Sequence, residues 1–290
     1  MHNKKYFNIC VIPIIVFVSI NIVVSVVSNF FIDNTLEDRL TKYQISKIKN
    51  KNNYVKNIFL GDSSLGNAIN AEIFEKLSGK ETLNLALWGN ASFAGAYALL
   101  ENINITDEQN IFIISSLDVW RRPPSDDIYH QTVSNFSFNS KINFTFKNIF
   151  NYSLNIYRLN SYFDKKEKKE YLFNDYIVQR ENVILKKNNF QKINYEQIKY
   201  LNKIFNFCDK KKINCLFVHG PIFEEHCQDI SSLEYINNVI VLLKANKIKN
   251  LEKIFCMKKE EMGDSDDHIN PKFKDQFTKN FYNLLLKQQY

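Results

Sequence analysis

A run of 26 residues without a charged side chain, from Phe7 to Ile32, is the feature that most constrains this chain. It exceeds the roughly 20 apolar residues that a helix needs to cross a bilayer. Lys4 and Lys5 precede it, so the positive-inside tendency keeps the N-terminus in the cytoplasm and places the remainder on the other side. We therefore predict a single-pass anchor over residues 1–32 and an extracytoplasmic domain, periplasmic or extracellular.

A cleaved signal peptide has the same order of a basic start and an apolar stretch. Its apolar region is typically only about 7–15 residues long, and a small-residue Ala-x-Ala site follows it. Here the run is longer and no such site follows. The sequence favours an uncleaved anchor over a signal peptide.

The composition beyond the anchor indicates a packed globular domain that does not bind nucleic acid. The net charge is +7, but the lysines are scattered among Asn, Ile, Phe and Tyr and form no basic stripe. Four cysteines, Cys208, Cys215, Cys227 and Cys256, fall in the part predicted to face an oxidising space. One or two disulfides can form there, in a pairing that the spacing leaves open.

Short apolar runs alternate with amphipathic segments after residue 57, which is typical of an α/β fold with a doubly wound parallel sheet. The expected strands cover 57–60, 82–87, 110–115, 213–218 and 251–256, and the expected helices cover 71–77, 93–103, 195–210, 233–245 and 273–286. We predict a helical stalk within 33–56, an α/β domain over 57–290, and an insertion at about 121–194. Aromatic residues of the insertion are candidates for a lid: Phe136, Phe138 and Tyr157.

Two polar motifs follow elements at opposite ends of the predicted domain. Gly61-Asp62-Ser63 ends the first strand, and Asp264-Ser265-Asp266-Asp267-His268 precedes the final helix. Loops at the carboxyl edge of a parallel sheet can lie together. A serine and a histidine brought together in this way would supply a nucleophile and its general base.

These motifs resemble the SGNH, or GDSL-like, hydrolase superfamily, whose flavodoxin-like sheet carries a Gly-Asp-Ser nucleophile after its first strand and a late Asp-x-x-His. The likeness covers about residue 57 to the C-terminus. It implies that Ser63 is the nucleophile and an oxyanion donor, that His268 is the base, and that Gly89 donates to the oxyanion. Asn90 is a candidate additional donor. With its anchor, the chain looks most like cell-envelope polysaccharide O-acetyl modifiers and teichoic acid D-alanyl transfer proteins.

The chain departs from the family pattern at two places. Where the family has Gly-x-Asn-Asp in its third block, this chain has Ser115-Ser116-Leu117-Asp118, so the oxyanion asparagine is missing. The family's acid lies three residues before the histidine, a position held here by Ser265. A one-residue bulge would let Asp264 orient the imidazole, with Asp266 as the second candidate. A Ser-His dyad helped by a backbone carbonyl is the third arrangement.

Ordinary structural roles compete with each of these assignments. Asp62 or Ser63 could simply start a helix, and His219 could be either a turn residue or a substrate contact at the sheet edge. His226 and Cys227, beside two glutamates, superficially suggest a metal site but have no second cluster of ligands. We predict no metal and no organic cofactor.

The resemblance implies a membrane-anchored serine esterase or O-acyltransferase. Its substrate would be an acyl ester, typically acetyl, of a cell-surface polysaccharide, and an acyl-enzyme would form. The alternative is a catalytically inactive SGNH-like domain that binds glycan or serves as a scaffold among envelope biosynthesis proteins.

Overall fold

The computed structural model describes residues 2–31, 36–50, 55–106, 108–124, 126–151, 156, 190 and 192–287. Its first helices are α1 (His2–Val26), the π-helix η1 (Val27–Phe31), α2 (Leu36–Asn50), α3 (Ser63–Ala68), α4 (Ala71–Ser78) and α5 (Ser92–Leu100). Later helices are α6 (Asp126–Ser134), α7 (Phe138–Lys147), α9 (Ile198–Lys211), α10 (Glu224–Gln228), α11 (Ile230–Ala245) and α12 (Lys274–Lys287). The strands are β1 (Asn57–Gly61), β2 (Thr82–Ala86), β3 (Asn110–Ser115), β4 (Asn214–His219), β5 (Ile222–Phe223), β6 (Asn250–Leu251) and β7 (Cys256–Met257).

The described residues form two compact units, which are considered separately below. One contains the chain up to Lys42 together with the segment that begins at His130, and so includes α1, η1 and α7. The other begins at Tyr43 and holds both sheets and every other helix from α3 onward except most of α6.

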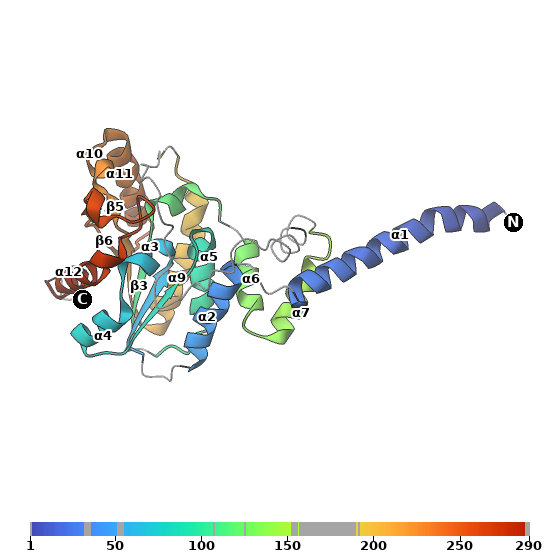
Figure 1. Ribbon diagram of the computed structural model, residues 1–290, viewed down its shortest axis with the longest axis horizontal. Coiled ribbons are helices and arrows are strands. Elements are labelled where there is room, and N and C mark those ends of the chain that lie inside the picture. Colours follow the sequence, from blue (N-terminus) through green and yellow to red (C-terminus); the bar gives the residue numbers. More distant parts are fainter. Residues whose placement is uncertain are drawn as a thin grey trace. The chain divides into compact units, whose positions relative to one another are not determined.

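The first unit contains the apolar helix that the sequence predicts (Figure 1). The 20-residue segment Val11–Phe30, which continues from α1 into η1, is long and apolar enough to cross a membrane. Large apolar side chains along it stand exposed, among them Ile14 at 61% and Val23 at 59%. Exposure of this extent is what a helix surrounded by lipid requires.

The second unit is built on a five-stranded sheet in the order β2-β1-β3-β4-β6, with every pair parallel. This is the order of flavodoxin-like sheets, whose switch point lies between β1 and β3. The strands are buried on both faces, as the apolar runs predict. The α/β fold class is confirmed, and the residues that follow β1 and β3 meet at the switch point.

Two aromatic clusters fix helices to opposite faces of this sheet. On one face, Phe59 and Phe112 stack with ring centroids 4.9 Å apart and pack with Phe281 of α12. On the other face, Phe93 of α5 packs on Phe217 of β4. Burial of such large apolar surfaces is the main favourable term in folding.

The predicted stalk is helix α2, and its second half contacts the sheet. Gln44 Nε2 donates to the carbonyl of Ala86 at 2.7 Å, and Lys47 Nζ donates to that of Asn84 at 2.6 Å. Both carbonyls belong to the edge strand β2. These side chains satisfy part of the open edge of β2, so this half of α2 belongs to the sheet unit.

The prediction of a single strand at 251–256 is wrong. Residues Asn250–Leu251 form β6 in the main sheet, whereas Cys256–Met257 form β7 and pair with β5 in a separate two-stranded sheet. The N–H of Ile222 donates to the carbonyl of Phe255 at 2.9 Å, so the chain already contacts β5 at the residue before β7.

All four cysteines of the sheet unit are paired in two disulfides. Cys208–Cys215 joins α9 to β4, and Cys227–Cys256 joins α10 to β7. The sequence left this pairing open.

The predicted insertion is described only in part. Helices α6 and α7 lie within it, but residues 157–189, which include the candidate lid residue Tyr157, lie outside the described residues. Of the other candidate lid residues, Phe136 and Phe138 belong to the unit of α1. A lid over the site therefore stays a prediction.

Candidate active site

The turn after β1 is fixed by close packing at Gly61. A Cβ atom at this position would lie 1.7 Å from the carbonyl oxygen of Ile114 on β3, so only glycine fits. Asp62 follows as the N-cap of α3, and Ser63 is the first residue of that helix. The first N–H groups of a helix have no acceptor within it. The Ser63 N–H is therefore available as a donor, as an oxyanion site requires.

Asp62 is buried and joins this turn to the end of β3. Its Oδ1 accepts from the backbone N–H of Ser64 at 3.0 Å and from the Ser64 hydroxyl at 2.7 Å. Its Oδ2 accepts from the Ser115 hydroxyl at 2.6 Å and from the N–H and hydroxyl of Ser116 at 2.9 and 3.1 Å. Ser115 and Ser116, at the end of β3, thus bind the Asp62 carboxylate.

The two adjacent serines of α3 differ in what their hydroxyls do. Ser64 is fully buried and donates to Asp62. Ser63 is half-buried, and within the described part of the chain its hydroxyl makes no hydrogen bond. Of these two serines, Ser63 is therefore the one whose hydroxyl is unengaged.

A compact loop presents His268. The antiparallel bridge between Met262 and Ile269 closes this loop, and the N–H of Gly263 donates to the carbonyl of His268 at 2.7 Å. Asp264 is buried, and its Oδ1 lies 2.7 Å from His268 Nδ1. The expected contact between Asp264 and the imidazole is present, with the carboxylate four residues before the histidine.

A second carboxylate faces the other ring nitrogen. Asp267 Oδ1 lies 3.7 Å from His268 Nε2 and also accepts a hydrogen bond from the Ser265 hydroxyl. Burial by itself would lower the pKa of His268, but the Asp267 and Asp264 carboxylates outweigh it and raise that pKa above the usual 6.5. Burial raises the pKa of the Asp267 carboxyl.

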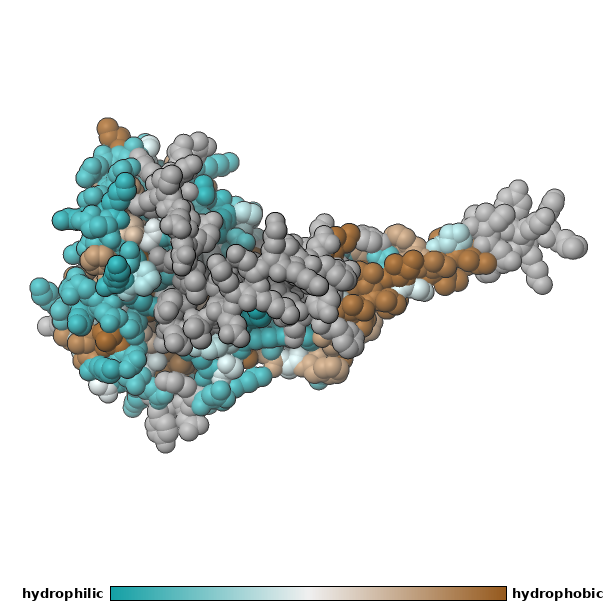
Figure 2. Space-filling view, viewed as in Figure 1, coloured by the Kyte–Doolittle hydropathy of each residue, from teal (hydrophilic) through white to brown (hydrophobic). Residues whose placement is uncertain are grey.

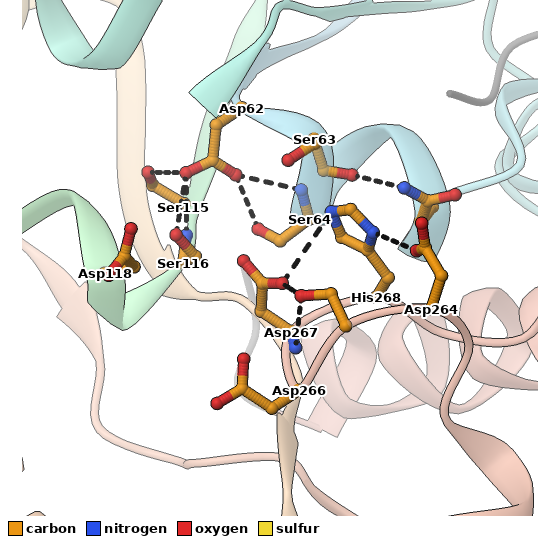
Figure 3. Close-up of polar contacts among 12 residues, drawn as sticks. Asp62, Ser63, Ser64, Ser115, Ser116, Asp118, Asp264, Asp266, Asp267 and His268 are labelled. Carbon is orange, nitrogen blue, oxygen red and sulfur yellow. Dashed lines mark hydrogen bonds and ion pairs between the residues drawn. The ribbon is translucent and has the colours of Figure 1, made fainter. Parts of the chain in front are cut away.

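The histidine loop and the serine turn lie in one region at the sheet's carboxyl edge (Figure 3). The negative charge of Asp62 reaches both His268 and Asp267 and raises the pKa of each. No hydrogen bond joins Ser63 to His268, two residues that the structure describes fully. The expected direct contact is thus not formed in this conformation, in which Nε2 faces Asp267. Catalytic hydrogen bonds are often long in unliganded sites.

Asp266, the second candidate for orienting His268, contacts a different histidine. Its Oδ2 lies 2.7 Å from His226 Nε2, and His226 Nδ1 lies 3.1 Å from the Ser232 hydroxyl. All three side chains are buried. Asp266 therefore binds His226 of α10, and the carboxylate that contacts His268 Nδ1 is that of Asp264.

His226 and Cys227 do not form the metal site that their spacing superficially suggests. Both ring nitrogens of His226 have partners, and Cys227 is in a disulfide. Within the described ranges, no group of three or more His, Cys, Asp or Glu side chains is placed to hold a metal ion.

The other candidate oxyanion donors, Gly89 and Asn90, follow β2 and lie next to Arg122. A Cβ on Gly89 would lie 2.7 Å from Arg122 Nη1, and that nitrogen donates to Asn90 Oδ1 at 3.2 Å. Arg122 is held by buried Asp118, to which its Nε donates at 2.7 Å, while Arg121 binds the other oxygen of the same carboxylate. A fixed positive charge therefore lies beside both predicted oxyanion residues.

His219 belongs to the core and does not line the site. It is the last residue of β4, 1% exposed, and packs edge-on against Phe217. Burial lowers its pKa to about 4, which keeps the ring neutral.

Three features of the candidate site were missed from the sequence: the Asp62 network, the Asp267 contact and the position of Arg122. Ser115 and Ser116 were a signal for the first, because hydroxyls at the end of a parallel strand can bind a carboxylate at the neighbouring strand's end. Arg121-Arg122 after Asp118 was a signal for the third, since helical spacing of three or four residues favours such ion pairs.

No family model matches the chain, and no curated protein matches it either. The assignment of a site therefore depends on the residues themselves and on their geometry.

Proposed function

We propose that this chain is a membrane-anchored serine esterase or O-acyltransferase of the SGNH type, acting on acyl esters of a cell-surface polysaccharide. The main support for the proposal is the position of Ser63. The half-buried Ser63, whose hydroxyl is unengaged, begins a helix at the switch point of the sheet, in the same region as a histidine paired with a buried aspartate.

In the proposed reaction, Ser63 Oγ attacks the acyl carbonyl carbon and its proton passes to His268 Nε2. Asp264 holds the Nδ1 proton, so that Nε2 carries the free lone pair of the neutral ring. Collapse of the tetrahedral intermediate breaks the ester C–O bond, and His268 returns the proton to the departing sugar oxygen. Water or a second hydroxyl then attacks the acyl-Ser63 ester and gives its proton to His268. Collapse of this second tetrahedral intermediate breaks the bond between the acyl carbon and Ser63 Oγ, and His268 returns the proton to Ser63.

The oxyanion of the intermediate would be stabilised by the N–H groups of Ser63 and Gly89 and by the Asn90 amide. The third-block asparagine is missing, and one such donor typically contributes about 3 kcal/mol to the transition state. We propose that Arg122 offsets this loss, because its guanidinium contacts Gly89 and Asn90. The helix α1 would anchor the domain on the extracytoplasmic side, near envelope glycans and other biosynthesis proteins.

Hydrolysis of p-nitrophenyl acetate by the full chain in detergent tests the enzymatic proposal. Ser63→Ala removes the nucleophile, so we expect the rate to fall by about 10³-fold or more. Ser64→Ala is the matched control, because it deletes the neighbouring hydroxyl, which donates to Asp62. Equal rates for wild type and Ser63→Ala would contradict the proposal.

A catalytically inactive glycan-binding or scaffold domain is the second candidate. The absence of a Ser63–His268 hydrogen bond and the missing asparagine favour it. In that case wild type and Ser63→Ala would bind envelope polysaccharide equally well and neither would release acetate from it.

A further inference from the structure

The unit that holds α1 exposes phenylalanines on a second helix. In α7 and the turn after it, Phe138, Phe146 and Phe150 are 68%, 67% and 61% exposed. Phe138, Ile142 and Phe146 are spaced four residues apart and so follow one face of the helix. Figure 2 shows apolar surface along α1 and a further tan patch at the place that α7 occupies in Figure 1.

Helix α7 packs against the C-terminal end of the apolar span. Ser25 Oγ donates to the carbonyl of Thr145 at 3.3 Å, and the rings of Phe30 and Phe138 meet edge-on with centroids 5.7 Å apart. Ser25, Ser28 and Asn29 are all buried. This contact shields polar groups of α1 and η1 that would be costly to expose to hydrocarbon.

The depth of this contact in the bilayer determines whether α7 can reach the membrane interface. The span ends at Phe30, and Ser25 lies five residues earlier, about 7.5 Å along the axis at 1.5 Å per residue. Helices that lie in a membrane interface bury their apolar face by about 5–10 Å. A helix that contacts α1 at Ser25 is therefore within reach of the boundary between headgroups and acyl chains.

We infer that α7 is an interfacial helix whose exposed phenylalanines insert into the same bilayer that α1 crosses. Lys141 and Lys147 lie on this helix, and basic side chains beside an apolar face suit anionic headgroups. The protein would then contact the membrane through two helices, the spanning helix α1 and the interfacial helix α7. The inference rests on the part of the proposed function in which α1 crosses the membrane.

The test uses the full chain with Phe146→Trp in nanodiscs of phosphatidylcholine and phosphatidylglycerol, with brominated lipid as the quencher. The signal of Trp88 and Trp120 is subtracted with the parent protein. We expect the added tryptophan to emit at shorter wavelength than one in water. It should lose more intensity to bromine placed near the headgroups than to bromine at the bilayer centre.

Two control variants separate the possible outcomes. Tyr195→Trp replaces a side chain that is 61% exposed in the sheet unit and should stay unquenched, whereas Val16→Trp reports on α1 itself. If the Val16→Trp variant is quenched and the Phe146→Trp variant behaves like Tyr195→Trp, the interfacial helix is wrong and the anchor stands. If neither Val16→Trp nor Phe146→Trp is quenched, the anchor and this inference both fail. A blue shift for Phe146→Trp without lipid quenching would indicate a protein partner and overturn the inference.

Discussion

At the scale of single residues, the site depends on how two carboxylates share one imidazole. In the proposed reaction, Asp264 contacts the ring nitrogen that would keep its proton, while Asp267 lies near the nitrogen that would accept one. Both raise the pKa of His268. In the proposed reaction Asp264 would orient the base, whereas the Asp267 charge would stabilise the protonated form of His268, which cannot accept a proton.

Asp267→Asn should shift the acidic limb of the activity profile to lower pH. A general base acts only when neutral, so activity is gained as pH rises through the pKa of His268, which the structure places above 6.5. Removing the Asp267 charge removes one cause of that elevation. The measurement is kcat/KM against pH, and an unchanged or higher midpoint would count against the assigned base.

Arg122→Met should lower kcat/KM by about 10-fold to 100-fold if its guanidinium supports the oxyanion. Arg121→Met is a matched control, because Arg121 binds the same Asp118 carboxylate. The two variants should lose similar stability in urea. Equal kcat/KM values for both would show that Arg122 is only structural.

At the scale of elements, Asp62 connects the start of α3 to the end of β3. Replacing an N-cap by alanine typically costs about 1 kcal/mol. Leaving the buried hydroxyls of Ser115 and Ser116 without their acceptor costs about 1–3 kcal/mol more. We expect Asp62→Ala to lower the free energy of unfolding in urea by about 2–4 kcal/mol.

Asn70→Ala provides the comparison for that prediction. Asn70 caps α4 by accepting from the N–H groups of Glu72 and Ile73, and its amide makes an exposed contact with Asp275. Its replacement should cost only about 1 kcal/mol. A similar loss for Asp62→Ala would mean that the link to β3 adds no stability.

The same scale shows what sequence patterns can and cannot predict. Segments with a clear apolar pattern and a clear boundary were predicted closely: the 110–115 strand is β3, and the helix expected to end before Gly79 is α4, with Gly79 in the left-handed region at φ 64°. The paired short strands β5 and β7 were missed, because two-residue strands have no period. The choice between Asp264 and Asp266 depends on which way each side chain leaves one loop, which spacing does not determine.

At the scale of the whole molecule, the two disulfides and the proposed membrane anchor are both consistent with a domain outside the cytoplasm. Chain entropy alone gives about 3.6 kcal/mol for a loop of roughly 30 residues and about 2.5 kcal/mol for one of roughly 8. These correspond to Cys227–Cys256 and Cys208–Cys215, with sequence separations of 29 and 7. Disulfides persist in oxidising compartments, so their presence supports the proposed extracytoplasmic location of the domain.

Counting thiols in the protein taken directly from cells tests this location. The chain has five cysteines, of which Cys10 lies in α1 and the other four are paired. If cells are quenched in acid and the chain is then denatured without reductant, we expect an alkylating agent to label one thiol per chain. Reduction should raise this to five, and Cys10→Ser should lower both numbers by one. Five labelled thiols before reduction would place the domain in a reducing compartment, because cytosolic thiols are kept reduced. That result would remove the basis for an envelope substrate while leaving the chemistry of Ser63 open to its own test.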